Sequence, residues 1–239
     1  MRAPRNDSEV EDHTDEQPPP RNAVRLLHEA DVEVAAQLLA RAFDHDPLTT
    51  AALPDRADRQ RITTRFMAHE LRTSLPAASC YGVGTGTALT GVAIWHPPHV
   101  TPSSLPATLR LGVELVTEAR TLLPAAPRLS RALVRDGAAL SRMTTKRQGA
   151  FQRAGQPPAT YLALLATDPD HRGQGVARQL MDHTLRRCDQ DGLAVWLHTS
   201  DPVNLGFYAR FGFSCIERIR GGRVVPDLWV LRRAPRRGD

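Results

Sequence analysis

One stretch of this sequence constrains the fold more than any other. Residues 161–188, YLALLATDPDHRGQGVARQLMDHTLRRC, pass from an apolar segment through a glycine-rich basic turn into a segment with helical periodicity. The run YLALLAT is short, apolar and closed by Asp168 and Pro169, which predicts a buried strand. From Val176 onward apolar residues recur every three or four positions with charged residues between them, which predicts an amphipathic helix. The chain therefore contains a strand–turn–helix unit.

The turn of this unit has the features of an anion site. Its two glycines let the chain turn tightly and leave its amides unobstructed. A helix N-terminus carries unpaired N–H groups and a partial positive charge, and an arginine adds a planar guanidinium suited to phosphate oxygens. The alternative is a tight turn with an exposed arginine. The candidate anion-binding residues are Arg172, Gly173, Gln174, Gly175, Val176 and Ala177.

The spacing within the turn separates it from two common phosphate loops. No lysine follows the second glycine, as a GxxxxGK[ST] loop requires, and the string is not GxGxxG. It reads RxxGxA, at Arg172, Gly175 and Ala177, with Pro169 three residues before. This resembles the acetyl-CoA signature of the GNAT superfamily of N-acetyltransferases. Residues 193–218, LAVWLHTSDPVNLGFYARFGFSCIER, resemble the strand, short helix and strand that follow in that family, and the likeness is greatest to the puromycin N-acetyltransferase group.

The order of the expected elements indicates an α/β fold. We expect a mixed, twisted sheet of about six to seven strands with helices on both faces, and the resemblance implies the GNAT fold. Asp31 is expected to cap the first helix, and residues 105–150 are expected to be a helical insertion that covers the acceptor pocket. Strands are expected over 24–27, 79–85, 89–98, 159–167, 193–199, 213–220 and 225–232, and helices over 31–43, 58–75, 175–191 and 203–211.

Length and charge indicate a single domain between two tails. The acidic, proline-rich segment 1–21 is expected to be disordered, 22–234 to form the domain with its insertion at about 103–155, and 235–239 to be a basic tail. The net charge is +5, but the basic residues are scattered, Lys146 is the only lysine, and no nucleic-acid motif is present. Nucleic acid is therefore not an expected partner.

Cysteine usage and hydropathy indicate the compartment. The three cysteines are widely spaced and form no CxxC pair, which indicates reduced thiols and argues against a metal site. There is no run of about eighteen apolar residues and no apolar core of a signal peptide. We expect a soluble, cytoplasmic protein that is not associated with a membrane.

The resemblance implies a donor site between two splayed parallel strands. Backbone groups of Leu165, Ala166 and Thr167 would pair with the pantetheine arm of acetyl-CoA, and an amide near Leu165 would polarise the thioester carbonyl. Tyr208 would donate a proton to the departing sulfur, and Asn204 would contact the cofactor. The alternatives are a core aromatic at position 208, beside two phenylalanines, and a helix cap at position 204.

The base and the acceptor side match the family less well. His198 stands where relatives have a glutamate, and a histidine can take a proton near neutral pH. A strand-end histidine bonded into the structure is the competing interpretation. Asp44, His45 and Asp46 would attract a cationic amine, or form a solvated loop, and Trp95 would be an aromatic wall for the acceptor, or a core residue.

The leading interpretation is an acetyl-CoA-dependent N-acetyltransferase, an acyltransferase that acts on a primary amine of a small molecule. An antibiotic or another aminated metabolite would be such a substrate. The acetyl group would be transferred to it directly in a ternary complex, and the enzyme would be a monomer or homodimer. One alternative is an enzyme that acts on protein N-termini or lysines. Another is a catalytically silent acyl-CoA-binding module that regulates a partner.

Overall fold

The computed structural model describes residues 23–85, 88–98, 149–150, 152–154, 156–221 and 226–236. Within them the chain forms a seven-stranded sheet in the order β1-β2-β3-β4-β5-β7-β6. The pairing of β4 with β5 is parallel and all other described pairings are antiparallel. The strands are β1 (Val24–Leu26), β2 (Ser79–Thr85), β3 (Ala88–His96), β4 (Ala159–Thr167), β5 (Ala194–Thr199), β6 (Ser214–Ile219) and β7 (Leu228–Arg233).

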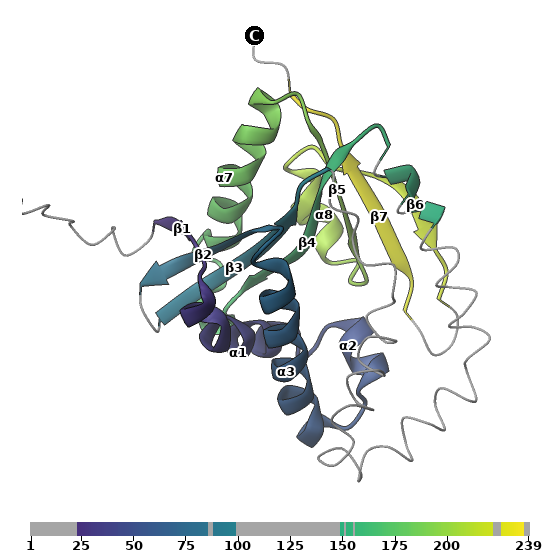
Figure 1. Ribbon diagram of the computed structural model, residues 1–239. Coiled ribbons are helices and arrows are strands. Elements are labelled where there is room, and N and C mark those ends of the chain that lie inside the picture. The colour runs from purple at the N-terminus through teal and green to yellow at the C-terminus, as the bar shows by residue number, and fades with distance from the viewer. Residues whose placement is uncertain are drawn as a thin grey trace, which may run out of the picture.

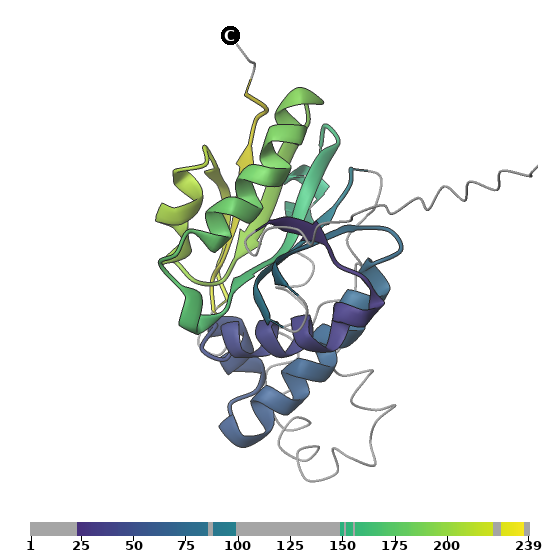
Figure 2. The same ribbon diagram turned by 90° about the vertical axis from the view of Figure 1, so that its left-hand side faces the viewer.

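Helices cover both faces of this sheet (Figures 1 and 2). On one face α1 packs on β3, β4 and the helix α3, and on the other α7 crosses the middle strands with α8 beside it. The expected α/β fold with a mixed sheet is therefore confirmed. The described helices are α1 (Val32–Ala42), α2 (Pro47–Ala52), α3 (Arg56–Ser74), α7 (Val176–Gln190) and α8 (Asn204–Ala209), with 3-10 turns at Glu29–Asp31 and Pro169–His171.

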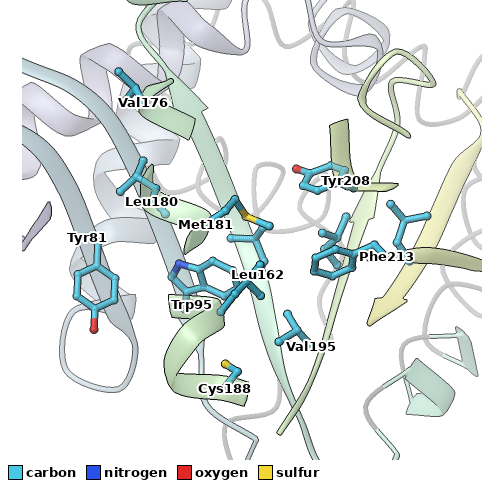
Figure 3. Close-up of a cluster of buried hydrophobic side chains, with 14 of the residues drawn as sticks. Tyr81, Trp95, Leu162, Val176, Leu180, Met181, Cys188, Val195, Tyr208 and Phe213 are labelled. Carbon is cyan, nitrogen blue, oxygen red and sulfur yellow. The ribbon is translucent and has the colours of Figure 1, made fainter. Parts of the chain in front are cut away.

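Each covered face has its own buried core. Under α7 the core joins Leu180 and Met181 to strand residues such as Trp95 and Leu197, and Figure 3 shows this cluster. Under α1 and α3 it joins Leu39 to Ile94 and other apolar side chains. Burial of apolar surface on both faces is the main stabilising contribution to such a layered fold.

The observed bounds follow the sequence pattern closely. The strand expected over 159–167 has those bounds, and α7 and β5 begin one residue later than expected. The expected insertion lies mostly outside the described residues, as do segment 1–21 and the last three residues. Of the insertion, 149–150 and 152–154 are described and helical.

The expected cap of the first helix is wrong. Asp31 makes no side-chain cap bond to α1. Its carboxylate instead accepts hydrogen bonds from the Arg25 guanidinium at 2.6 and 2.8 Å and from the His28 N–H at 2.9 Å. The carboxylate thus closes the 3-10 turn in front of α1, because a nearby arginine binds it more strongly than a backbone amide does.

No described helix is long and apolar enough to cross a membrane.

Candidate active site

The strands β4 and β5 part halfway along their length. In the described chain they pair only from Ala159↔Ala194 to Leu162↔Leu197, although β4 continues to Thr167. Beyond Leu162, β4 keeps its antiparallel partner β3, as far as Thr167↔Gly91. The edge of β4 that faces β5 therefore has unused backbone groups over residues 163–167, as the expected splay requires.

The alternation of the strand identifies which backbone groups face this opening. The N–H of Asp168 donates to the carbonyl of Thr90 on β3 at 2.9 Å. Because neighbouring residues of a strand direct their N–H and C=O groups to opposite sides, those of Leu165 and Thr167 point toward β5 and those of Ala166 toward β3. Of the three cofactor candidates on β4, two thus present their backbone to the opening. The buried Oγ1 of Thr167 also has no partner among the described residues.

The turn after β4 leads directly to the N-terminus of α7. Gly173 and Gly175 have φ angles of +77° and +81°, and a Cβ built on either meets no heavy atom within 4 Å. These glycines are required by the left-handed backbone and not by close packing. Gly175 caps α7 without a side-chain bond, and the first N–H of the helix bonded within it belongs to Gln179. The amides of residues 176–178 therefore point outward as donors for an anion.

Asp168 holds the start of this turn. Its carboxylate, which is 8% exposed, accepts from Arg41 of α1 at 2.5 Å and from the N–H of Asp170 at 3.0 Å. Burial raises the pKa of Asp168, but the bonds from Arg41 and Asp170, together with the nearby His171 ring, outweigh it and hold the pKa below its ordinary value. Arg172 is exposed and donates at 3.4 Å to the carbonyl of Ala42, the last residue of α1. The turn is thus tied to α1 at two points.

Tyr208 lies over the point where the strands part. It is 8% exposed and belongs to the same buried cluster as Leu162 and Leu197, the last pair before the opening. Figure 3 shows its hydroxyl pointing toward the side of the cluster on which Met181 lies. The ring also contacts Phe207 and Phe213 edge-on. Burial raises the pKa of the phenol well above its usual value, so the hydroxyl stays protonated near neutral pH and can donate.

His198 lies on the opposite face of the sheet from Tyr208. It is the first residue of β5 beyond the last pair with β4, and its Nδ1 is 2.9 Å from the hydroxyl of Tyr161. Leu197 packs with Tyr208 under α7, while Trp196 packs on the other face, so alternation places His198 with Trp196. The candidate acid and the candidate base thus flank the opening from its two sides.

Asn204 and the loop after α1 are held by bonds at the end of β5. The Asn204 amide donates to Thr199 Oγ1 at 3.3 Å and is not the N-cap of α8, which is Val203. Asp46 caps α2 by accepting from the N–H groups of residues 48 and 49, and its other oxygen accepts from Ser200 at 2.9 Å. The alternative of a freely solvated loop therefore does not describe Asp46.

The three other acceptor candidates differ in their surroundings: Asp44 lies near an arginine, His45 is exposed and Trp95 is buried. Asp44 lies 3.8 Å from the Arg59 guanidinium, and His45 is 79% exposed and 3.6 Å from Asp44. Trp95 is 1% exposed in the core under α7, and its Nε1 has no partner among the described residues (Figure 3). The expectation of an aromatic acceptor wall at Trp95 is therefore wrong, because the pleat directs this side chain into the α7 core and away from the face of His198.

Two residues of this region were missed in the sequence. Tyr161 is the first residue of the apolar run YLALLAT in β4, and only the parallel register of β4 and β5 places it beside His198. Arg41 lies 127 positions before Asp168, and no local pattern connects the two. Alternation with its neighbour Leu162 could have put Tyr161 on a definite face, but it could not have supplied the partner.

Part of this sequence is similar to known acetyltransferases. Residues 135–213 match the model of the acetyltransferase (GNAT) family. An uncharacterized N-acetyltransferase of Schizosaccharomyces pombe is 32% identical over 78 residues, which are 31% of this chain and 31% of that protein. The chain therefore matches about a third of the length of that relative.

Solved structures share the fold over most of the chain. A Corynebacterium glutamicum structure described as histone acetyltransferase HPA2 and related acetyltransferase has a TM-score of 0.59 at 15% identity, covering 92% of this chain and 99% of its own. The polyamine N-acetyltransferase of Drosophila melanogaster has a TM-score of 0.52 at 17% identity, and the match covers 89% of this chain and 99% of the Drosophila chain. The PaiA N-acetyltransferase of Thermoplasma acidophilum, solved with coenzyme A, has a TM-score of 0.52 at 11% identity. This match covers 89% of this chain and 98% of the Thermoplasma chain. The sheet and its helices are those of the GNAT fold.

Proposed function

We propose that this chain, which has the GNAT fold and matches the GNAT family model over residues 135–213, is an acetyl-CoA-dependent N-acetyltransferase that acts on a primary amine of a small molecule. One observation carries the proposal. The only parallel pair of strands in the described sheet opens after Leu162↔Leu197, and two proton-transfer candidates flank that opening. The N-terminus of α7, with its unpaired amides, follows the same strand β4.

The donor side of the proposal fits the residues present. The backbone of Leu165 and Thr167 would pair with the pantetheine arm, and the amides from Arg172 to Ala177 would hold the pyrophosphate. Thr167 Oγ1, buried without a described partner, is a further polar atom at the same edge. Binding energy gained at the turn would position the thioester near the opening. Asn204, held by Thr199, would contact the same substrate.

The chemistry needs one proton accepted and one donated. A cationic amine first releases one proton to solvent. His198 then takes a proton from the neutral amine, whose nitrogen forms a bond to the thioester carbonyl carbon as the C–S bond breaks and leaves its electron pair on sulfur. Tyr208 gives its hydroxyl proton to that sulfur, and the proton held by His198 returns to the phenol through solvent. The products are the acetamide and the free thiol of CoA, so atoms and charge balance.

The loop after α1 supports a cationic amine as the acceptor. Asp44 and His45 lie there beside Asp46, whose carboxylate reaches Ser200 at the end of β5. A carboxylate near the opening favours a cationic amine, and the Drosophila structure with the same fold is named as a polyamine N-acetyltransferase. The wider likeness to the puromycin N-acetyltransferase group supports an antibiotic or another aminated metabolite as the acceptor, turned over by a monomer or homodimer.

The direct test is incubation of the protein with acetyl-CoA and a panel of amines, with release of free thiol measured. The panel should contain polyamines, arylalkylamines, aminonucleosides and a peptide with a free N-terminus. Thiol release with a small amine and not with the peptide supports the proposal. Turnover of the peptide alone identifies a protein acetyltransferase, and tight acetyl-CoA binding without turnover of any amine identifies a silent acyl-CoA-binding module.

A further inference from the structure

A row of four rings crosses three strands on the face opposite α7. His96, Tyr161 and Trp196 are register partners on β3, β4 and β5. The Tyr161 ring stacks on Trp196 with centroids 4.1 Å apart and lies 5.9 Å from His96. Tyr161 is 6% exposed, so its ring is fixed between its neighbours.

His198 is the next residue of β5 on this face. Its ring is nearly parallel to that of Tyr161, at 12°, with the centroids 6.0 Å apart, and its Nδ1 is 2.9 Å from the Tyr161 hydroxyl. Tyr161 lies in the last stretch where β4 and β5 pair, and His198 lies immediately beyond it. A rigid phenol therefore holds the imidazole at the point where the strands begin to part.

The bond to Nδ1 decides what the other nitrogen can do. A neutral imidazole has one donor and one acceptor nitrogen, and the phenol oxygen can play either role toward Nδ1. If Nδ1–H donates to the phenol oxygen, Nε2 carries the lone pair and accepts the proton. Once Nε2 is protonated, the bond from Nδ1–H becomes charge-assisted and stronger.

We infer that Tyr161 is a positioning residue, which holds His198 in the tautomer protonated at Nδ1 so that Nε2 receives the proton of the acceptor amine. This inference rests on the proposed function for the role of the proton and for the choice of tautomer, because the observed 2.9 Å contact places the phenol at Nδ1 and either atom of that contact can donate. The ionisable groups of the described elements packed around His198 include His96 on β3, Tyr161 on β4, Arg232 on β7, Asp46 through Ser200, and Glu217 on β6 with its ion-pair partner Arg153.

The chain supplies a matched control. Tyr81 is also 6% exposed and its hydroxyl also contacts a side chain, Arg187 at 3.2 Å, but it lies under α7 and away from His198. Tyr81→Phe removes a comparable buried hydroxyl without touching the row. Any effect of Tyr161→Phe that Tyr81→Phe shares is therefore structural.

The first test reads the tautomer without any turnover. Two-dimensional ¹H–¹⁵N spectra of the histidine rings are recorded for the wild type, Tyr161→Phe and Tyr81→Phe, with His198 assigned from its loss in His198→Gln. We expect neutral His198 to be protonated at Nδ1 in the wild type and Tyr81→Phe, and to become a mixture of tautomers in Tyr161→Phe. Protonation at Nε2 in the neutral wild type, or an unchanged His198 signal in Tyr161→Phe, overturns the inference.

The second test uses the pH dependence of turnover. Loss of the charge-assisted bond destabilises the protonated ring, so in Tyr161→Phe the acid limb of kcat/KM should move to lower pH while kcat falls by about tenfold. The KM for acetyl-CoA should stay within about twofold, because the donor site is untouched. A fall in kcat without movement of the limb contradicts the inference. If the wild type turns over no amine, the proposed function fails while the spectra still decide the tautomer.

Discussion

Arg41, near the end of α1, donates a hydrogen bond of 2.5 Å to the buried carboxylate of Asp168, where β4 passes into the glycine turn. The same carboxylate accepts from the N–H of Asp170. One side chain thus connects the helix before the acceptor loop with the turn proposed to hold the pyrophosphate. The two sides of the site are joined through Asp168.

Substitution of this arginine should weaken both the fold and the donor site. Arg41→Ala leaves the Asp168 carboxylate buried without its cation, and we expect a loss of about 1–3 kcal/mol in the free energy of unfolding. CoA affinity should fall several-fold, because the turn loses its anchor. Urea unfolding and titration calorimetry measure the two effects. Arg61→Ala is the control, since its exposed pair with Asp58 should contribute less than about 0.5 kcal/mol. Equal effects of the two substitutions would refute this role of Arg41.

The two ends of α7 offer a test of the glycine turn. Gly175 and Gly192 both have positive φ, +81° and +67°, with open space around the missing Cβ. Alanine at either position should therefore cost about 1–2 kcal/mol of stability through the left-handed backbone. Only Gly175→Ala should also reduce CoA affinity, because Gly175 precedes α7 and sets the orientation of the free N–H groups at the helix N-terminus, which would bind the pyrophosphate. Calorimetric titration separates the two variants, and equal affinities in both would argue against the turn as the pyrophosphate site.

The phenol of Tyr208 should matter for turnover and not for binding. Tyr208→Phe removes the proposed proton donor while its ring keeps the contacts with Phe207 and Phe213. We expect kcat to fall by about 10²–10⁴ and the Kd for CoA to change little. Tyr81→Phe again serves as the control. Retention of full kcat in Tyr208→Phe would leave this tyrosine as a core aromatic only.

Acid should weaken the link between α7 and β7. Arg233 is 3% exposed and donates two bonds, of 2.6 and 2.7 Å, to Asp189, and these bonds hold the pKa of Asp189 below its ordinary value. A carboxyl with a lowered folded-state pKa stabilises the protein above its unfolded pKa of about 3.9 and loses that contribution as pH falls through the folded value. Asp189→Asn should therefore be less stable than the wild type at pH 7, with the difference shrinking as pH falls below about 4. Urea titrations across this pH range measure the difference, and one that is constant with pH would exclude the charge as its source.

Local patterns predicted most of the fold, because the information for each element lies within it. The apolar run of β4 ends at Asp168 and Pro169, and the strand ends there in the structure. Both glycines of the turn have the left-handed backbone that their position indicated. Element order then implied the mixed sheet.

Partners that lie far apart in the sequence could not be predicted in this way. Asp46 caps α2 and accepts a bond from Ser200, which lies 154 positions later, and no local pattern connects these two residues. Trp95 follows the same alternation as its neighbours, and the sequence did not reveal which face of β3 looks toward the acceptor side. The pairing of Tyr161 with His198 depends on a parallel register that only the assembled sheet defines.

We propose that a CoA thioester lies between β4 and β5 with its pyrophosphate on the turn before α7. Amide hydrogen exchange of the wild-type protein, with and without acetyl-CoA, tests this most directly. We predict slower exchange on binding at the amides of Leu165, Thr167 and residues 172–178, whose N–H groups would be bonded by the ligand, and no change in α3. Unchanged exchange across 165–178 at saturating acetyl-CoA would contradict it.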